Sequence, residues 1–406
     1  MKKPWTIGCG AALLTAVLLT GLGGARGEEG PSPPDGPPVV VGLDADMSSG
    51  SAESGEAIRR GLVLAAEEIN GRGGVLGRPL KLEVRDHRGN PARGIDNVKE
   101  LGRRDDVVAV VGGLHTPVAL AELEAIHALG LPYLVPWAAG TPVVDNGYEP
   151  NFVFRASVRD EYAGGFLVNE IARMGYRRPA LLLEQTGWGK SNHRAMTEAL
   201  AVHDLEPATV QWFHWGSPSL MPQLETAVAS GADVVLLTAN APEGVAAVRS
   251  MSEMSPEKRL PVVSHWGITG GDFYARARES LRKVRLVFLQ TFSFLDPPFP
   301  DRARRVADAY VEAFPPARGP RDIFSPVGTA HAYDLLHLLA LAVEKAGTTD
   351  RAAVRDALEK IDRYPGLVRD YEPPFTPERH DALDTSDFRL ARYDENGVIV
   401  PLDDLP

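Results

Sequence analysis

Ten polar, aromatic and small residues of this chain fall at the ends of apolar runs, in short corners that often contain glycine or proline. They are Asp46, Ser49, His115, Thr116, Trp137, Ala138, Gly140, Trp188, Asn240 and Trp266. Indole rings offer apolar contact area, while hydroxyl, amide and carboxylate groups fix orientation through a few hydrogen bonds. This combination is typical of a pocket for a small organic molecule, and we predict that these residues bind one.

Motifs that would indicate an enzyme are missing from the sequence or incomplete. No Gly-x-Ser-x-Gly elbow and no His-Glu-x-x-His motif occurs. The segment 187–191 resembles part of a phosphate-binding loop, but Glu184 stands where the first glycine is required. His331, Asp334 and His337 share a strongly apolar stretch, which favours a core role over metal binding. We therefore expect no catalytic activity, no metal and no cofactor; the alternative of a secreted α/β hydrolase is open to an esterase assay.

The apolar runs alternate with amphipathic helical patterns. Continuous runs such as 39–43 indicate strands buried on both faces, as in parallel sheets covered by helices. Ligands of open parallel sheets bind outside the carboxyl ends of the strands, so the ten residues should lie along such edges. Strands are predicted at 39–43, 80–85, 107–111, 133–137, 180–184, 209–213, 234–237, 261–264 and 286–292.

The alternation breaks in the segment 141–160 and changes again after Leu286. Two open sheets in tandem fit these interruptions better than one wide sheet. A closed (β/α)₈ barrel is the main alternative, since the number of units nearly fits. Farther on, the helix predicted at 327–345 is apolar almost all round, which predicts deep burial. The runs 388–393 and 398–402 are predicted to form a hairpin.

The first 27 residues have the pattern of a secretory signal peptide, followed by a proline-rich leader at 28–38. Removing residues 1–27 would remove the single cysteine, Cys9, and three basic residues, Lys2, Lys3 and Arg26, taking the net charge from −11 to −14. The remaining 379 residues suffice for two domains. Negative charge argues against nucleic acid as a partner, and no later run is long enough to span a bilayer. We expect a monomeric periplasmic protein whose mature chain does not insert into the membrane.

Several segments together resemble the type I periplasmic binding proteins, in particular the branched-chain amino-acid receptors of ABC importers. The longest match is 61–80, Gly-Leu-Val-Leu-Ala-Ala-Glu-Glu-Ile-Asn-Gly-Arg-Gly-Gly-Val-Leu-Gly-Arg-Pro-Leu. The other matching segments are 82–86, 110–113, 132–136 with Thr141-Pro142, Phe154-Arg155 with Asp160, and 332–334. The resemblance covers nearly the whole chain after the leader, and it is more specific for the fold than for the ligand.

The resemblance implies two doubly wound, Rossmann-like α/β lobes, joined by three crossovers, that close on a ligand. It assigns 39–155 plus 290–361 to the N-terminal lobe and 156–289 plus 362–406 to the C-terminal lobe. Receptors of this family hold a ligand carboxylate with backbone N–H groups and hydroxyls of the first lobe. Those positions fall here on His115, Thr116, Ala138 and Gly140, while Trp188 and Asn240 fall on contact positions of the second lobe.

The second lobe departs from the family where an acidic residue commonly meets the ligand ammonium, because this chain has Trp266 there. Asp46 stands where the family more often has an apolar residue or proline, so the counter-charge is predicted to have moved to the first lobe. With Trp137 and Trp188, these residues would form a box for an organic cation or zwitterion. Two alternatives stay open: Asp46 or His115 braces its own loop, and Trp137 packs beneath its loop.

The expected function is an extracytoplasmic solute-binding receptor of an ABC importer, which delivers its ligand to an inner-membrane permease. The expected ligand is a small amino-acid-like, carboxylate or zwitterionic molecule. A ligand-sensing receptor of the same fold, coupled to a signalling partner, is the alternative. Two further tryptophans, Trp212 and Trp215, are expected to be structural.

Overall fold

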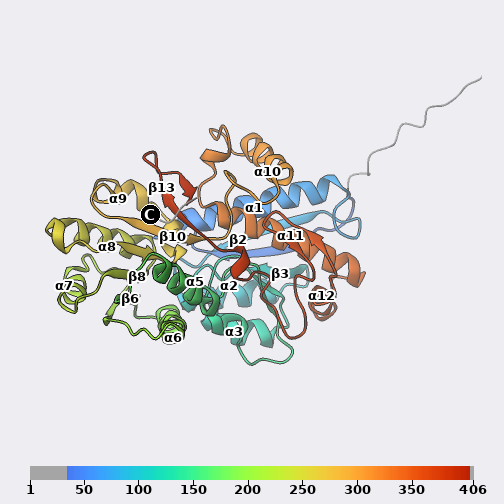
Figure 1. Cartoon of the computed structure of the whole chain (residues 1–406). Helices are drawn as coiled ribbons and strands as arrows, with labels where there is room; N and C mark the ends of the chain where they lie inside the picture. The colour runs from blue at the N-terminus through green and yellow to red at the C-terminus, as the bar shows by residue number, and fades with distance from the viewer. Residues whose placement is uncertain (1–33, 403–406) are drawn as a thin grey trace, which may run out of the picture.

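The computed structural model describes residues 34–402, so the predicted signal peptide and residues 28–33 of the leader lie outside the described residues. Within this range the chain forms two α/β lobes that lie side by side (Figure 1). The end of the leader lies against a turn of the first lobe, where Arg78 Nε donates to the Pro37 carbonyl at 2.7 Å.

The first lobe is built on five parallel strands in the order β2-β1-β3-β4-β5. In chain order these strands are β1 (Val39–Ala45), β2 (Leu80–Asp86), β3 (Val107–Val111), β4 (Tyr133–Val135) and β5 (Val153–Arg155). The helices of this lobe are α1 (Ala52–Gly71), α2 (Pro91–Gly102), α3 (Thr116–Ala128), α4 (Thr141–Val144), α10 (Pro300–Ala313), α11 (Pro326–Ala346) and α12 (Arg351–Leu358).

The second lobe is built on seven strands in the order β14-β13-β10-β9-β8-β6-β7, of which β13 and β14 run antiparallel to their neighbours. The strands are β6 (Pro179–Glu184), β7 (Thr209–Phe213), β8 (Val234–Thr238), β9 (Val262–Ser264), β10 (Leu286–Gln290), β13 (Arg389–Tyr393) and β14 (Ile399–Pro401). The helices are α5 (Asp160–Arg173), α6 (Gly187–Val202), α7 (Met221–Ala229), α8 (Ala241–Glu253), α9 (Phe273–Leu281) and the 3₁₀ turn η2 (Trp266–Gly270).

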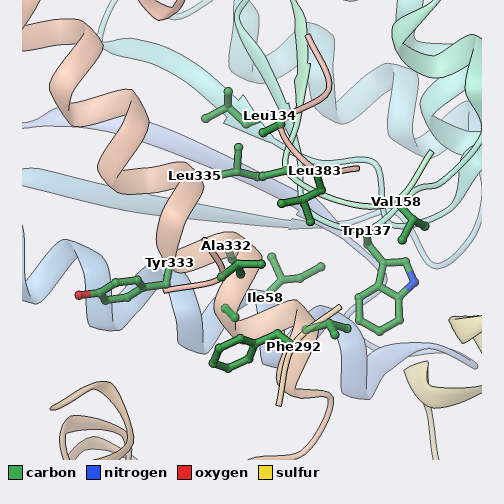
Figure 2. Close-up of a cluster of buried hydrophobic side chains, with 14 of the residues drawn as sticks. Ile58, Leu134, Trp137, Val158, Phe292, Ala332, Tyr333, Leu335 and Leu383 are labelled. Atoms are coloured by element: carbon green, nitrogen blue, oxygen red, sulfur yellow. The ribbon is translucent and has the colours of Figure 1, made fainter. Parts of the chain in front are cut away.

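Helix α11 fills the centre of the first lobe. Of its 21 residues 17 are buried, as its nearly uniform apolar sequence predicts. Figure 2 shows its Leu335 among side chains from several elements, including Ile58 of α1 and Leu134 of β4. A short ribbon of β11 (Tyr364–Pro365) and β12 (Asp370–Tyr371) packs on α11, where the Asp334 carboxylate accepts the N–H groups of Leu367 and Val368.

Three crossovers join the lobes: after β5, after β10 and between α12 and β13. The first and third lie side by side, because Arg155 pairs with Asp381 in a parallel bridge. The fully buried Arg155 side chain fastens this hinge: its Nε lies 2.5 Å from Asp381 Oδ1, and its Nη1 donates to the carbonyls of Ala138 and Gly140. The hinge is thereby bonded directly to the loop that follows β4.

The predicted alternation of strands and helices is confirmed, and the two separate sheets show that the barrel alternative is wrong. The predicted C-terminal hairpin is confirmed as β13 and β14. The helix after β6 begins at Gly187 instead of 192, because the Thr186 hydroxyl caps it by accepting the Trp188 and Gly189 N–H groups. Strand β5, helix α9 and the β11–β12 ribbon were not predicted; the three strands have only two or three residues, too few for a periodic signal. Across residues 34–402, no helix combines the length and apolar character needed to cross a bilayer.

Candidate functional site

A small cavity lies between the lobes, where the carboxyl ends of strands from both sheets face each other. Seven of the ten predicted residues line it: His115, Thr116, Trp137, Ala138, Trp188, Asn240 and Trp266. Leu114, Pro117, Ala139 and Glu184 complete its wall, whereas Asp46, Ser49 and Gly140 do not line it. The cavity volume is about 10 Å³, room for roughly one water molecule. A larger solute therefore enters only when the lobes separate or the aromatic side chains rotate.

Direct hydrogen bonds between the lobes hold the cleft in this narrow form. Ser54 of α1 donates its hydroxyl to the Gly270 carbonyl of the second lobe at 3.0 Å. The N–H group of Thr141 donates to the hydroxyl of Ser191 on α6 at 3.1 Å. Both contacts join one lobe to the other, so they break when the lobes move apart.

Three tryptophan rings form the apolar part of the wall. The ring centroids of Trp137 and Trp266 lie 5.3 Å apart, across the boundary between the lobes. Trp188 is held by its Nε1, which donates to Asp160 Oδ1 at 3.1 Å. A Cβ atom on Gly267 would lie 2.5 Å from the Trp188 ring, so only glycine lets that ring lie where it does. Trp137 is both a wall residue and part of the first-lobe core (Figure 2).

The carboxylate of Asp46 is occupied by its own loop. It accepts the N–H groups of Ser49 and Ser51 at 2.8 and 3.0 Å and the Ser49 hydroxyl at 2.5 Å. His115 Nε2 lies 3.5 Å from its Oδ2. Although burial opposes ionisation, the hydrogen bonds from His115, Ser49 and Ser51 hold the pKa of Asp46 well below its usual value. The geometry therefore favours the loop-bracing alternative for Asp46, with Ser49 as one of its donors.

The first-lobe N–H groups assigned to a ligand carboxylate are also engaged within the protein. Ala138 N–H donates to the Gly113 carbonyl at 2.6 Å, and Gly140 N–H donates to the Thr116 hydroxyl at 3.1 Å. Pro117, the second residue of α3, has no N–H to offer. A carboxylate bound here would have to replace these internal hydrogen bonds or use other donors of the two loops.

Glu184 is the charged residue among the four wall residues that were not predicted. It is the last residue of β6, it is fully buried, and it lines the cavity from the second lobe. Its Oε1 accepts the Thr186 hydroxyl at 2.6 Å, and its Oε2 accepts Trp215 Nε1 at 2.8 Å and Asn240 Nδ2 at 3.0 Å. Burial raises the pKa of Glu184 to about 8, and these hydrogen bonds offset only part of that effect.

Trp215 closes the cleft beside Glu184. Its ring centroid lies 5.4 Å from that of His115 on the opposite lobe, so it contributes to the cleft as well as to the fold. Its side chain remains 37% exposed, which places it at the mouth of the cleft. The prediction of a purely structural role for Trp215 is therefore too narrow, while Trp212 packs against the hydrophobic core as expected.

No group of three or more His, Cys, Asp or Glu side chains with the geometry to hold a metal ion occurs among residues 34–402. His331 of α11 is fully buried; its ring nitrogens contact Thr291 Oγ1 at 2.9 Å and the Pro136 carbonyl at 2.8 Å. These bonds fit the core role predicted for it.

The sequence matches known proteins over nearly the whole chain. A family model described as periplasmic binding protein matches residues 38–397, and the chain belongs to this family. An amino acid binding protein of Pseudomonas aeruginosa is 26% identical over 364 residues, which are 88% of this chain and 91% of that protein. The Leu/Ile/Val-binding protein BraC3 of Rhizobium johnstonii is 22% identical over 332 residues, 81% of this chain and 86% of that protein.

The same fold is found in solved structures. The crystal structure of a type 1 periplasmic binding protein from Bordetella pertussis Tohama I superimposes with a TM-score of 0.81 at 21% identity. The superposition covers 90% of this chain and all of that one. The two-lobe architecture expected from the sequence is thereby confirmed.

Proposed function

We propose that this chain is the extracytoplasmic solute receptor of an ABC importer and traps a small amino-acid-like molecule between its lobes. The single observation that carries the proposal is the aromatic-walled cavity, to which the strand ends of both lobes contribute. Membership of the periplasmic binding protein family and the amino-acid-binding relatives support it. The proposed partner is an inner-membrane permease, the proposed state is a monomer without enzymatic activity, and the proposed location is the periplasm, reached through an N-terminal signal peptide.

The cleft explains how a solute would drive closure. Only contacts that exist in the closed form shift the balance between open and closed lobes. Trp137 on one lobe and Trp266 on the other meet in the closed form, so a solute held between them gains contacts that the open form lacks. The permease would then distinguish the loaded receptor by its shape.

Two measurements test the proposal. Native mass spectrometry of freshly purified protein is expected to find a retained small solute that is lost on mild denaturation and refolding. Small-angle scattering of the refolded protein is expected to show a smaller radius of gyration when that solute is returned. A protein that retains no solute and whose scattering does not change with any candidate solute would contradict a receptor function.

A further inference from the structure

Glu184 brings a buried carboxyl group without a positively charged partner to the cleft wall, so burial disfavours its ionised form until a cation binds beside it. A carboxylate has about four lone-pair positions, and hydrogen bonds from Thr186, Trp215 and Asn240 occupy three of them. All three donors are neutral groups, so they solvate the charge without balancing it. Among residues 34–402, no Lys or Arg nitrogen lies within 4.0 Å of this carboxylate.

Two other buried carboxylates lie near Glu184 and share its shortage of positive partners. Asp160 is fully buried, and its Oδ2 has no hydrogen-bond partner. Glu243 is 3% exposed and accepts the Gly216 N–H at 2.8 Å. In the described part of the chain, Asp160 has only His265 within ion-pair distance, at 3.3 Å, and Glu243 has no such partner. Both carboxylates add repulsion at Glu184.

The first lobe does not supply the missing charge from its side of the cavity. His115 lines the same cavity, but its Nε2 points to Asp46, whose carboxylate is already saturated by loop donors. The rest of the wall consists of aromatic, aliphatic and neutral polar residues. A cationic group of a ligand would therefore relieve the repulsion, whereas a carboxylate placed beside Glu184 would add to it.

The chemistry of the wall also indicates which kind of cation fits. Indole faces attract organic cations through their quadrupole, and they exclude the water that a hydrated metal ion retains. Trp137, Trp188 and Trp266 line the same cavity as Glu184, and Trp215 donates its Nε1–H to the Glu184 carboxylate at 2.8 Å.

We propose that Glu184, Asn240 and Trp215 form a subsite for the positively charged group of a small organic cation, and that the ligand needs no carboxylate. This inference rests on the proposed receptor function and narrows its substrate class. It also assigns the counter-charge to the first strand of the second lobe, instead of to Asp46. Amines and quaternary ammonium compounds are the expected ligands, and amino acids would bind through their ammonium group.

The test compares two probes of nearly equal shape on the full-length wild-type protein. Choline carries a quaternary ammonium, and 3,3-dimethylbutan-1-ol has a neutral carbon in its place. Isothermal titration is expected to find choline bound at least about tenfold more tightly than the neutral alcohol. Benzoate, an apolar anion, is expected not to bind. Equal affinity for the two alcohols would overturn the proposal, and so would benzoate binding in the absence of choline binding.

Two variants test whether the carboxylate of Glu184 is the group that contacts the cation. Glu184→Gln is expected to weaken choline binding by about 30-fold or more, because the buried cation loses its partner. The matched control is Glu170→Gln, another mostly buried glutamate of the same lobe, which pairs with Arg173 about 15 Å along α5 from Asp160. The control is expected to bind choline as the wild type does. Unchanged choline affinity in a folded Glu184→Gln variant would refute the subsite.

The same experiments separate this inference from the proposed function. If benzoate or another anion binds and compacts the protein while choline does not, the receptor function stands and the cation subsite is refuted. If native mass spectrometry finds no solute and no probe produces a scattering change, both are refuted. The comparison of choline with its neutral analogue needs no variant, so it decides the question even if Glu184→Gln does not fold.

Discussion

Two buried carboxyl groups of the first lobe make a specific prediction about stability and pH. Asp44, on β1, and Glu122, on α3, are both fully buried and interact with each other. Asn97 Nδ2 donates to Asp44 Oδ1 at 2.8 Å, and the Tyr133 hydroxyl donates to Glu122 Oε2. Burial raises the pKa of Asp44 from 3.8 to about 7, and burial and the charge of Asp44 raise the pKa of Glu122 well above its usual value.

The sign of the effect follows from proton binding. In the unfolded chain Asp44 loses its proton near pH 4, while in the folded protein it keeps the proton up to about pH 7. The folded state therefore binds more protons between these values, and the free energy of unfolding falls as the pH rises. The rise in the pKa of Asp44 corresponds to about 4 kcal/mol between pH 4 and pH 8.

The perturbation is Asp44→Asn, which keeps an acceptor for Asn97 and removes the titrating group. Urea unfolding is to be measured at several pH values from 4 to 8 for the wild type and the variant. The wild type is expected to lose about 4 kcal/mol more than the variant over this range. Asp301→Asn, a change at an aspartate whose side chain is 85% exposed, is the control and should follow the wild type. Wild-type and Asp44→Asn curves that run parallel within about 1 kcal/mol would refute the reasoning.

Three further predictions concern the cleft and the hinge. Gly267→Ala places a methyl group 2.5 Å from the Trp188 ring and 2.6 Å from the Ala239 carbonyl oxygen. We expect a loss of about 1–3 kcal/mol in stability and at least about tenfold in solute affinity, and equal affinity by calorimetry would show that this corner of the cleft does not contact the solute. Asp46→Asn weakens the hydrogen bonds of its loop and should lower the free energy of unfolding in urea by about 1–3 kcal/mol. Choline affinity should stay within about twofold of the wild type, and a tenfold loss would indicate that Asp46 of the first lobe, and not Glu184, balances the charge of the ligand. Arg155→Met removes the shorter ion pair of the buried Asp381 and leaves it only Arg159 Nη1 at 3.3 Å. Thermal and urea unfolding should report a loss of about 3–5 kcal/mol, and a loss smaller than about 1 kcal/mol would mean that the Arg155–Asp381 pair adds little to stability.

The sequence predicts the fold well because the strands that build it are long apolar runs. The parallel pairing of β1 with β3, for example, follows from two buried apolar strands and a connection long enough to contain helices. Strand β5 and the β11–β12 ribbon were not predicted because they are too short to show a periodic pattern. Their positions are decided by distant partners, such as Asp334 for the ribbon.

The position of the candidate site was predicted from the sequence, but which carboxylate faces the cavity was not. Strand ends bring His115, Trp137 and Trp266 together, and this follows from topology alone. Whether a carboxylate faces a ligand or its own loop depends on where the nearby backbone N–H groups point, and the spacing of residues in the sequence does not show this. The order Asp46-Met-Ser-Ser does carry the signal of an Asx turn, which favours loop bracing. For Glu184 the available signal was a charged residue ending an otherwise apolar strand.

The position of α11 has a consequence for how the protein is made. Its side chains complete a core begun by strands near the start of the chain, yet the helix itself ends only at Ala346. A nascent chain that has been synthesised only as far as the second lobe therefore lacks helix α11, which the core of its first lobe needs. The first lobe cannot complete its folding, and its apolar strands stay exposed, until most of the polypeptide has been synthesised. Premature release or truncation before this helix would leave those apolar strands exposed and favour aggregation.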